Sequence, residues 1–434
     1  MDKSFTSHEA KDNMIPTTLI SQIVILQRVP NQLPIDLFID VSKAMPWSQR
    51  RQGSRVRQSR QERSRTSALN IALWNPSIIM PHSLTIRQKK GKASDIYYPL
   101  YLHLVLKPTP GPGELLVKLE AAALNHRDLF IRKHLYPDIS FETPLLSDGY
   151  GVVVEVGPGC ASSDHLLHQA VLLTPCRGWK SDPNGPEDYS HFSVIGGTEP
   201  NHHLGAAQNY ICVDQFEVEP CPRHLSPAEG AALPSCGLTA WRALVTKSGN
   251  AEPGRNILVT GIGGGVALQT LQFGLALGCN MYVTSSSQEK IDKARQLGAK
   301  GGVIYKNENW PTTLQKMLPA ERHFLDAVVD GAGGNIITKT TALLKPGGII
   351  SCYGMTMGPS MEWSMPAVLK NIELRGSTLG SRSEFRDMIN FVKTKEIRPI
   401  ISRTVKGLDC VDAIDGLFDD MKAAKQFGKL VIEM

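Results

Sequence analysis

The chain has 434 residues, of which 41% are hydrophobic and 20% are charged. This composition is typical of a globular protein, and the length predicts two domains. The net charge of +6 gathers at the start: residues 1–79 hold 11 Lys and Arg against 6 Asp and Glu, so the rest is nearly neutral and gives no sign of nucleic-acid or membrane binding. Eight cysteines without a CxxC pair argue against a disulfide framework and favour a reducing, cytoplasmic location, with a mitochondrial one only weakly supported.

Residues 1–79 are expected to form a disordered basic extension. The stretch "QRRQGSRVRQSRQERSR" at 49–65 holds seven arginines and one acid, with no apolar periodicity. A nucleic-acid-binding tail or a targeting element remain alternatives for it. The apolar run "LISQIVIL" is too short to span a bilayer.

Residues 80–216 are predicted to form a β-rich module. Short β segments bounded by turns occur at 115–124, 151–159, 170–175 and 209–214.

Residues 217–376 change to strands alternating with helices, which predicts a parallel, doubly wound sheet. The expected strands are 256–261, 280–285, 301–305, 325–333 and 347–354, with helices at 266–278 and 287–298. Residues 377–434 are expected to return to the first module.

The most informative stretch is "LVTGIGGGVALQ" at 258–269, where a strand runs into glycines and a helix follows from Val266. Glycines allow the tight turn and the close approach of a pyrophosphate, and the helix N-terminus offers free N–H groups to it. This pattern predicts a dinucleotide site at Gly261, Gly263, Gly264, Gly265 and Val266.

The end of the next strand indicates which nucleotide is bound. An acidic residue usually binds the ribose of NAD there, but this chain has Ser285, Ser286 and Ser287, followed by Lys290. Hydroxyls and a cation suit a 2′-phosphate, which favours NADP(H). The serines alternatively cap the next helix, and both roles are compatible.

The chain resembles the medium-chain dehydrogenase/reductase superfamily over residues 82–434. The resemblance rests on "GPGELLVKLEAAALNHRDL", "AALPSCGLTAWRAL", "VTGIGGGVA", "YVTSSSQEKI", "LKPGGIISCYG" and "KQFGKLVIEM", which are similar to the quinone-oxidoreductase-like and zinc-type alcohol dehydrogenase-like branches. It implies an α/β protein with a GroES-like catalytic domain and a Rossmann domain, usually a homodimer. By family position it places Thr239, Tyr305, Tyr353 and Gly354 beside the cofactor.

The same resemblance implies that no metal is bound. Zinc-dependent members have a cysteine where this chain has Asn125 and a histidine at the place of Ser147, while Cys236 lies near the third ligand's place. A catalytic zinc needs about three protein ligands. Cys176, Cys212 and Cys221 are too sparse for a structural zinc lobe.

Without zinc, reduction of a quinone or of a conjugated C=C bond fits best, because hydrogen bonds can stabilise the developing oxyanion. Asn125 is the expected amide donor, and Asp128 either orients it or binds Arg127. His126 is a less favoured proton donor. Trp179, Met355, Met357 and Trp363 are either pocket or packing residues.

Three alternatives remain. The stretch "TGIGGG" also resembles short-chain dehydrogenases, but the Tyr-x-x-x-Lys pair that they need is absent from the sequence. An alcohol dehydrogenase that holds metal through other ligands is the second. The third is a non-enzymatic relative that holds cofactor and binds nucleic acid through residues 49–65.

Overall fold

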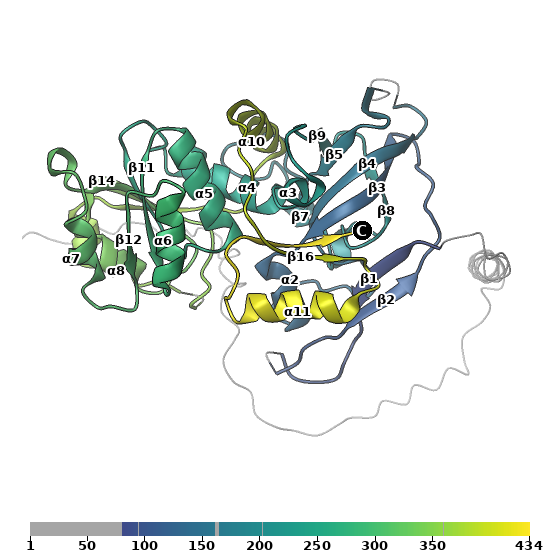
Figure 1. Ribbon diagram of the computed structural model, residues 1–434, viewed down its shortest axis with the longest axis horizontal. Helices are drawn as coiled ribbons and strands as arrows, with labels where there is room; N and C mark the ends of the chain where they lie inside the picture. The colour runs from purple at the N-terminus through teal and green to yellow at the C-terminus, as the bar shows by residue number, and fades with distance from the viewer. Residues whose placement is uncertain (1–79, 94, 161–164, 202, 359) are drawn as a thin grey trace, which may run out of the picture. The chain divides into compact units, whose positions relative to one another are not determined.

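The computed structural model describes residues 80–93, 95–160, 165–201, 203–358 and 360–434, which belong to one compact unit (Figure 1). Residues 1–79 lie outside this part, so the expectations for the basic extension stay predictions. No helix in the described part is long and apolar enough to cross a membrane.

The first half is built on a seven-stranded sheet in which β3 (Glu114–Ala123) is central. The strand order is β16-β17-β3-β4-β5-β9, and β8 also pairs with β3. All pairs are antiparallel except β16 with β17. The other strands are β4 (Asp148–Val156), β5 (Ala170–Leu173), β8 (Tyr210–Asp214), β9 (Val218–Pro220), β16 (Ile401–Lys406) and β17 (Lys429–Glu433), with the separate pairs β1 (His82–Ile86) with β2 (Leu100–Leu104) and β6 (Cys176–Arg177) with β7 (Ser193–Val194).

Residues 401–434 of the C-terminal segment return to this first half, whereas α10 (Arg382–Lys395), also within the predicted return of 377–434, packs in a core with Leu238 and Ala240 of the second half. Leu417 and Phe418 of α11 (Val411–Lys422) pack in one core with Leu115 and Val117 of β3. Figure 1 shows this segment in yellow, with α11 beside β16 and α2 (His126–Arg132). The return brings the start of β17 next to the end of β3.

The second half is a six-stranded, wholly parallel sheet in the order β12-β11-β10-β13-β14-β15. This is the order of a dinucleotide-binding doubly wound sheet, with its switch point between β10 and β13. The strands are β10 (Asn256–Val259), β11 (Asn280–Ser285), β12 (Gly301–Ile304), β13 (Leu325–Asp330), β14 (Leu344–Cys352) and β15 (Glu373–Gly376). The helices that follow β9 are α3 (Pro227–Ala231), α4 (Pro234–Trp241), α5 (Gly265–Ala276), α6 (Gln288–Gln296), α7 (Trp310–Gln315), α8 (Ile336–Thr340), α9 (Met365–Leu369) and α10 (Arg382–Lys395), with a π-helical turn at Arg242–Lys247 and a 3₁₀ turn at Ala320–Arg322. The 3₁₀ turns Tyr189–His191 and Glu199–Asn201 belong to the first half.

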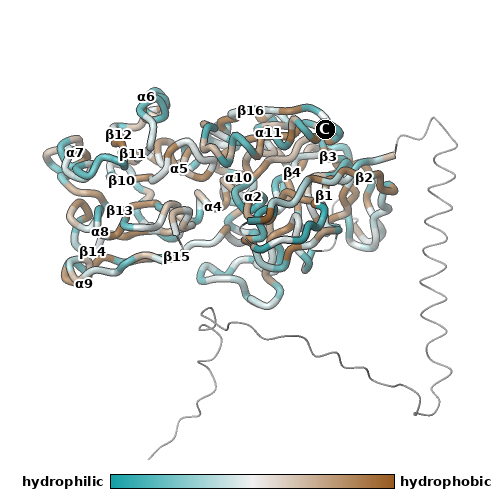
Figure 2. Tube along the Cα trace, turned by 90° about the horizontal axis from the view of Figure 1, so that it is seen from below, coloured by the Kyte–Doolittle hydropathy of each residue, from teal (hydrophilic) through white to brown (hydrophobic). Residues whose placement is uncertain are grey.

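Both faces of the parallel sheet are covered, as such sheets require. Ile257 and Val259 of β10 pack in one core with Leu268 of α5, whereas Leu258 between them packs with Leu314 of α7 and Ile337 of α8 on the other face. The hydropathy view shows this half with α6 at one edge and α9 at the other (Figure 2). The predicted fold class is therefore confirmed.

The border between the halves differs slightly from the expected one. The predicted second domain starts at residue 217, but β9 (Val218–Pro220) pairs with β5 in the first sheet. A three-residue strand has too short a pattern to be recognised in the sequence.

Candidate cofactor-binding and active site

The glycine loop lies between β10 and α5, at the switch point of the parallel sheet. Gly261 and Gly263 have φ angles of 67° and 120°, a region that side chains with a Cβ rarely adopt. Helix α5 begins at Gly265, one residue before the expected start, and its N-cap Gly264 contributes no side-chain hydrogen bond. The first N–H groups of α5 are therefore left for a ligand, and an anion is favoured there by the helix dipole.

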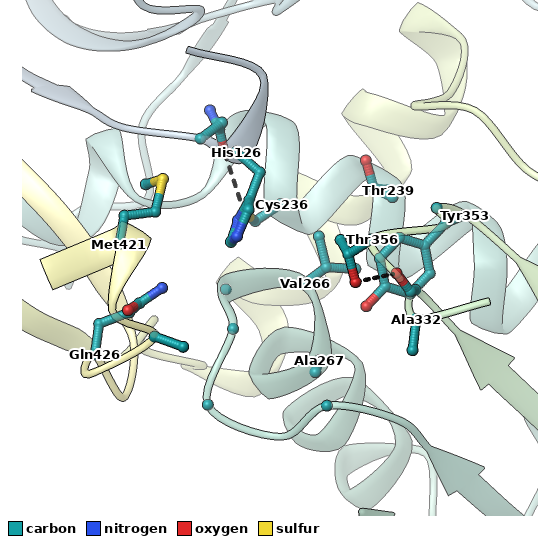
Figure 3. A pocket seen from close by; sticks show the side chains of 18 of the residues that line it. His126, Cys236, Thr239, Val266, Ala267, Ala332, Tyr353, Thr356, Met421 and Gln426 are labelled. Carbon is teal, nitrogen blue, oxygen red and sulfur yellow. Dashed lines mark hydrogen bonds between the residues drawn. The ribbon is translucent and has the colours of Figure 1, made fainter. Parts of the chain in front are cut away.

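A cleft of about 510 Å³ opens over this loop. Figure 3 shows Met421 and Gln426 of the C-terminal segment on one side of the loop, and Ala332, Tyr353 and Thr356 on the other. Thirteen of the fifteen predicted site residues line the cleft: Asn125, Thr239, Gly261, Gly263, Gly264, Gly265, Val266, Ser285, Ser286, Lys290, Tyr305, Tyr353 and Gly354. The fold thus brings predicted residues from both halves of the protein together in one cleft.

Asp128 and Ser287 are the two predicted residues that lie outside the cleft lining. Ser287 Oγ accepts from the Lys290 backbone N–H at 3.4 Å and caps α6, as in the capping alternative. Asp128 is fully buried, and its Oδ2 accepts from the Asn125 N–H at 2.7 Å. Burial raises the pKa of Asp128 to about 6, although the nearby Arg127 opposes this. The geometry favours the structural interpretation of Asp128.

Lys290 reaches across the glycine loop to the C-terminal segment. Its Nζ donates to the carbonyl oxygens of Ala424 and Gln426, both at 2.8 Å. A Cβ at Gly263 would stand 2.9 Å from Lys290 Cδ, so glycine makes this crossing possible. An ammonium has three donors, so one donor of Lys290 remains for a ligand.

Asp330 stabilises the wall of the cleft through hydrogen bonds that the sequence did not predict. Asp330, at the end of β13, accepts from Thr260 Oγ1 at 2.6 Å and from the Gly333 N–H at 2.8 Å. Burial raises the pKa of Asp330, and these hydrogen bonds oppose the rise. The carboxyl thereby ties the turn after β13 to the end of β10, beside the Tyr353 ring that packs on Gly331.

The opposite end of the cleft contains a buried ammonium. Lys429 is the first residue of β17 and is 4% exposed. Its Nζ donates to the Leu124 carbonyl oxygen at 2.8 Å, to Asn125 Oδ1 at 2.7 Å and to Asp148 Oδ2 at 2.8 Å. Cys236 Sγ lies 3.5 Å from the same Nζ. We call Asn125, Asp148, Cys236 and Lys429 the Lys429 cluster.

The Lys429 cluster is internally satisfied and electrically balanced. Asn125 Nδ2 donates to Asp148 Oδ2 at 3.0 Å, so the predicted amide donor is engaged within the cluster. Burial alone would lower the pKa of Lys429, but the charge of Asp148 and the thiol of Cys236 outweigh it, and the pKa is raised. Burial also raises the pKa of Cys236, against the effect of Lys429. One ammonium therefore faces one carboxylate and a neutral thiol.

His126 lies next to the cluster and lines the cleft. Its surroundings lower the pKa of the imidazole, mainly by desolvation and then through the charges of Lys429 and Lys133. A neutral imidazole is therefore expected at pH 7.

The described chain was compared with known proteins. Residues 111–223 match the alcohol dehydrogenase GroES-like domain, and residues 265–394 match the zinc-binding dehydrogenase domain. The zinc-type alcohol dehydrogenase-like protein YogA of Leptosphaeria maculans is 66% identical over 82% of this chain and 100% of its own length. The chain belongs to the zinc-type alcohol dehydrogenase-like family of medium-chain oxidoreductases. Proteins of this family bind a nicotinamide cofactor.

Solved structures agree with this assignment. A putative alcohol dehydrogenase from Sinorhizobium meliloti 1021 is 28% identical, covers 82% of this chain and 100% of its own, and superposes with a TM-score of 0.70. Crotonyl-CoA carboxylase/reductase AntE in complex with NADP, at 22% identity, covers 82% of this chain and 94% of its own with a TM-score of 0.64, which shows the same fold. The short-chain alternative is thereby excluded.

The family name implies a zinc ion, which the side chains at the expected ligand positions would have to bind. The residues at the three expected ligand positions are Asn125, Ser147 and Cys236, and the Lys429 ammonium contacts two of them. Within the part of the chain that the structure describes, no group of three or more His, Cys, Asp or Glu side chains is placed to hold a metal ion. These donors do not fit a catalytic zinc, which takes three nitrogen, sulfur or carboxylate ligands.

The candidate pocket aromatics and methionines divide between the two roles. Met355 lines the cleft, whereas Trp179, Met357 and Trp363 do not. Trp179 is buried and packs its ring under the Arg242 guanidinium at 4.4 Å. The aromatic side chains of the lining are instead Phe130, Tyr136, Tyr305 and Tyr353.

Proposed function

We propose that this oxidoreductase uses NADP(H) and reduces a quinone or an α,β-unsaturated carbonyl without a catalytic zinc. The observation that carries the nucleotide preference is the charge of the cleft. Lys290 contributes a cationic side chain to its lining, whereas the charges of Arg127 and Lys429 are opposed by the buried Asp128 and Asp148, and no Asp or Glu is among the described lining residues. A cofactor with an additional phosphate gains most from such a cleft.

The site at the end of β11 supports the same preference. Ser286 is exposed and lines the cleft, and Lys290 has one donor left after its two carbonyl contacts. A carboxylate at this point would repel a 2′-phosphate, and none is present at positions 285–287. The glycine loop would hold the pyrophosphate on the N–H groups of α5.

The class of hydride acceptor is inferred from the hydrogen-bond donors at the end of the cleft beside the Lys429 cluster. The bound cofactor supplies the hydride, and this chain must polarise the acceptor. Ser235, Thr239 and His126 are the hydroxyl and imidazole groups that line the cleft beside the Lys429 cluster. Neutral donors of this kind suit an enolate or a quinone oxygen, where charge is delocalised. An alcohol dehydrogenase, the alternative, would need a stronger electrophile than these neutral donors to polarise the oxygen of a simple alcohol or aldehyde.

The nucleotide proposal is tested by fluorescence titration of the purified protein with NADPH and with NADH. We expect NADPH to bind at least tenfold more tightly, about 1.4 kcal/mol. Lys290→Met should remove most of this preference, whereas Lys293→Met, on the same helix but paired with Glu289 in solvent, should keep it. An equal affinity for both nucleotides in the wild type would refute the preference but not the cofactor site.

We further propose a homodimer, as the resemblance implies, with the β15 edge of the parallel sheet as its interface. Trp363, Met365, Val368, Leu369 and Leu374 expose large apolar side chains along α9 and β15. Unpaired sheet edges and apolar patches are typical of such interfaces. Light scattering should give twice the chain mass, and Leu369→Glu should reduce it to a monomer, whereas Leu135→Glu, at an exposed position elsewhere, should not.

A further inference from the structure

The three positions at which zinc-holding relatives carry their ligands meet in one place in this protein. Asn125 caps α2, Ser147 precedes β4, and Cys236 lies in α4. Cys236 Sγ lies 3.4 Å from Asn125 Oδ1, and Asn125 Nδ2 lies 3.4 Å from Ser147 Oγ. The geometry of a three-ligand site is thus kept, although two of its side chains are poor zinc ligands.

Lys429 lies against two of these positions, Asn125 and Cys236. A zinc ion bound by Asn125 Oδ1 and Cys236 Sγ would need bonds of about 2.0–2.3 Å to both atoms. The Lys429 Nζ already contacts these atoms, at 2.7 Å and 3.5 Å. An ammonium and a zinc ion would therefore compete for the same space, and their like charges would repel strongly at such a distance.

The buried carboxylate of Asp148 also needs this cation. Asp148 is fully buried, and its two oxygens accept from the Ser235 N–H at 2.8 Å and from Lys429 Nζ at 2.8 Å. A carboxylate in the protein interior is stable only if it is paired and hydrogen-bonded. The sole ion pair of Asp148 among the described residues is the one with Lys429.

We propose that the Lys429 ammonium is a built-in replacement for the metal ion: it lies against the side chains of two of the three ligand positions, Asn125 and Cys236, holds Asn125 and Asp148 in place, and excludes a divalent cation. Lys429 is thus a positioning residue, because its donors point at protein atoms. The proposal rests on the zinc-free part of the proposed function. Its tests measure metal binding and stability rather than turnover or nucleotide affinity, so the two can fail separately.

The first test asks whether the ammonium excludes a metal. Asn125→Cys with Ser147→His restores a zinc-type donor set beside Cys236, and a second protein adds Lys429→Met. Cobalt(II) is titrated into both, with the visible d–d absorption of a tetrahedral site as the readout. We expect a stoichiometric signal only when Lys429 is absent. A stoichiometric signal with Lys429 present would overturn the proposal, as would no signal in either folded protein.

The second test needs no metal and covers the case in which the redesigned proteins fold poorly. Lys429→Met should lower the Tm by several degrees, because Asp148 loses its cation. Lys429→Met with Asp148→Asn removes both charges and should recover most of the loss. If the single variant is as stable as the wild type, or if the double variant is no more stable than the single one, Lys429 is not the cation that holds the cluster.

Discussion

The glycine loop and the Lys429 cluster meet at Gly265 but are built in opposite ways. The loop is one contiguous stretch, residues 261–266, and acts through backbone N–H groups and φ angles. The cluster draws its four side chains from segments up to 304 residues apart. A ligand site made of backbone is therefore local in the sequence, whereas a site made of buried side chains depends on the whole fold. Substitutions in the loop and near the cluster should therefore have different effects.

The largest effect is expected next to the cluster, at Asp128, whose Oδ2 accepts from the backbone N–H of the cluster residue Asn125. Its folded-state pKa is raised from 3.8 to about 6, so the folded state binds the proton more tightly than the unfolded chain. The stability from this protonated carboxyl is complete below pH 3.8 and is lost as the pH rises through 6. Relative to Asp128→Asn, the wild type should lose about 3 kcal/mol of unfolding free energy over this range.

Urea unfolding of both proteins from about pH 3.5 to about pH 7, the range in which Asp128 titrates in the unfolded and folded chain, measures this difference. Asp387→Asn, at an exposed position of α10, serves as the control and should show no such trend. A difference that stays constant with pH would contradict the burial of Asp128, whose Oδ1 accepts no hydrogen bond among the described residues and lies 3.5 Å from Arg127 Nη1.

The junction of the two regions should show an intermediate effect. A Cβ at Gly265 would stand 2.7 Å from Cys236 Sγ and 2.8 Å from Lys429 Cδ. Gly265→Ala should therefore cost about 1–3 kcal/mol without any cofactor present. Gly264→Ala, whose Cβ would meet nothing closer than 3.8 Å, should leave that stability nearly unchanged. Equal losses in both variants would show that the loop does not pack on the cluster.

The smallest effects are expected on the nucleotide side, where neighbouring serines have separate roles. Ser287→Ala removes the N-cap of α6 and should cost about 1 kcal/mol of stability while the NADPH preference is kept. Ser286→Ala should leave stability unchanged and weaken NADPH relative to NADH, because Ser286 lines the cleft. Thermal unfolding measures the stability of the two variants, and nucleotide titration measures their preference for NADPH over NADH.

The sequence predicts the local features well. The alternation of strands and helices and the β-rich module were confirmed, because each depends on hydrophobic periodicity and turn residues within a short window. The capping box of Ser226 and Glu229 at the start of α3 is local in the same way, since its two residues are three positions apart. Thirteen of the predicted site residues line one cleft, because glycine loops and strand ends have fixed places in this fold.

The sequence does not predict how side chains from distant segments pair. Lys429 lies in the stretch "GKLVIEM", which indicated the family but gave no reason to place an ammonium beside Asn125. The Thr260–Asp330 bond joins two strands that are neighbours only because of the crossover order of the sheet. For Asp128 the sequence leaves open whether it orients Asn125 or binds Arg127, because the burial of a side chain cannot be read from a single helical turn.

The central claim is that this medium-chain oxidoreductase reduces conjugated acceptors without a metal. The most direct measurement is the initial rate of NADPH oxidation with a quinone and with an enone, before and after exhaustive chelation and with added zinc. We predict turnover that neither chelation nor zinc changes. Turnover that is lost on chelation and restored by zinc, or activity confined to simple alcohols and aldehydes, would contradict the account.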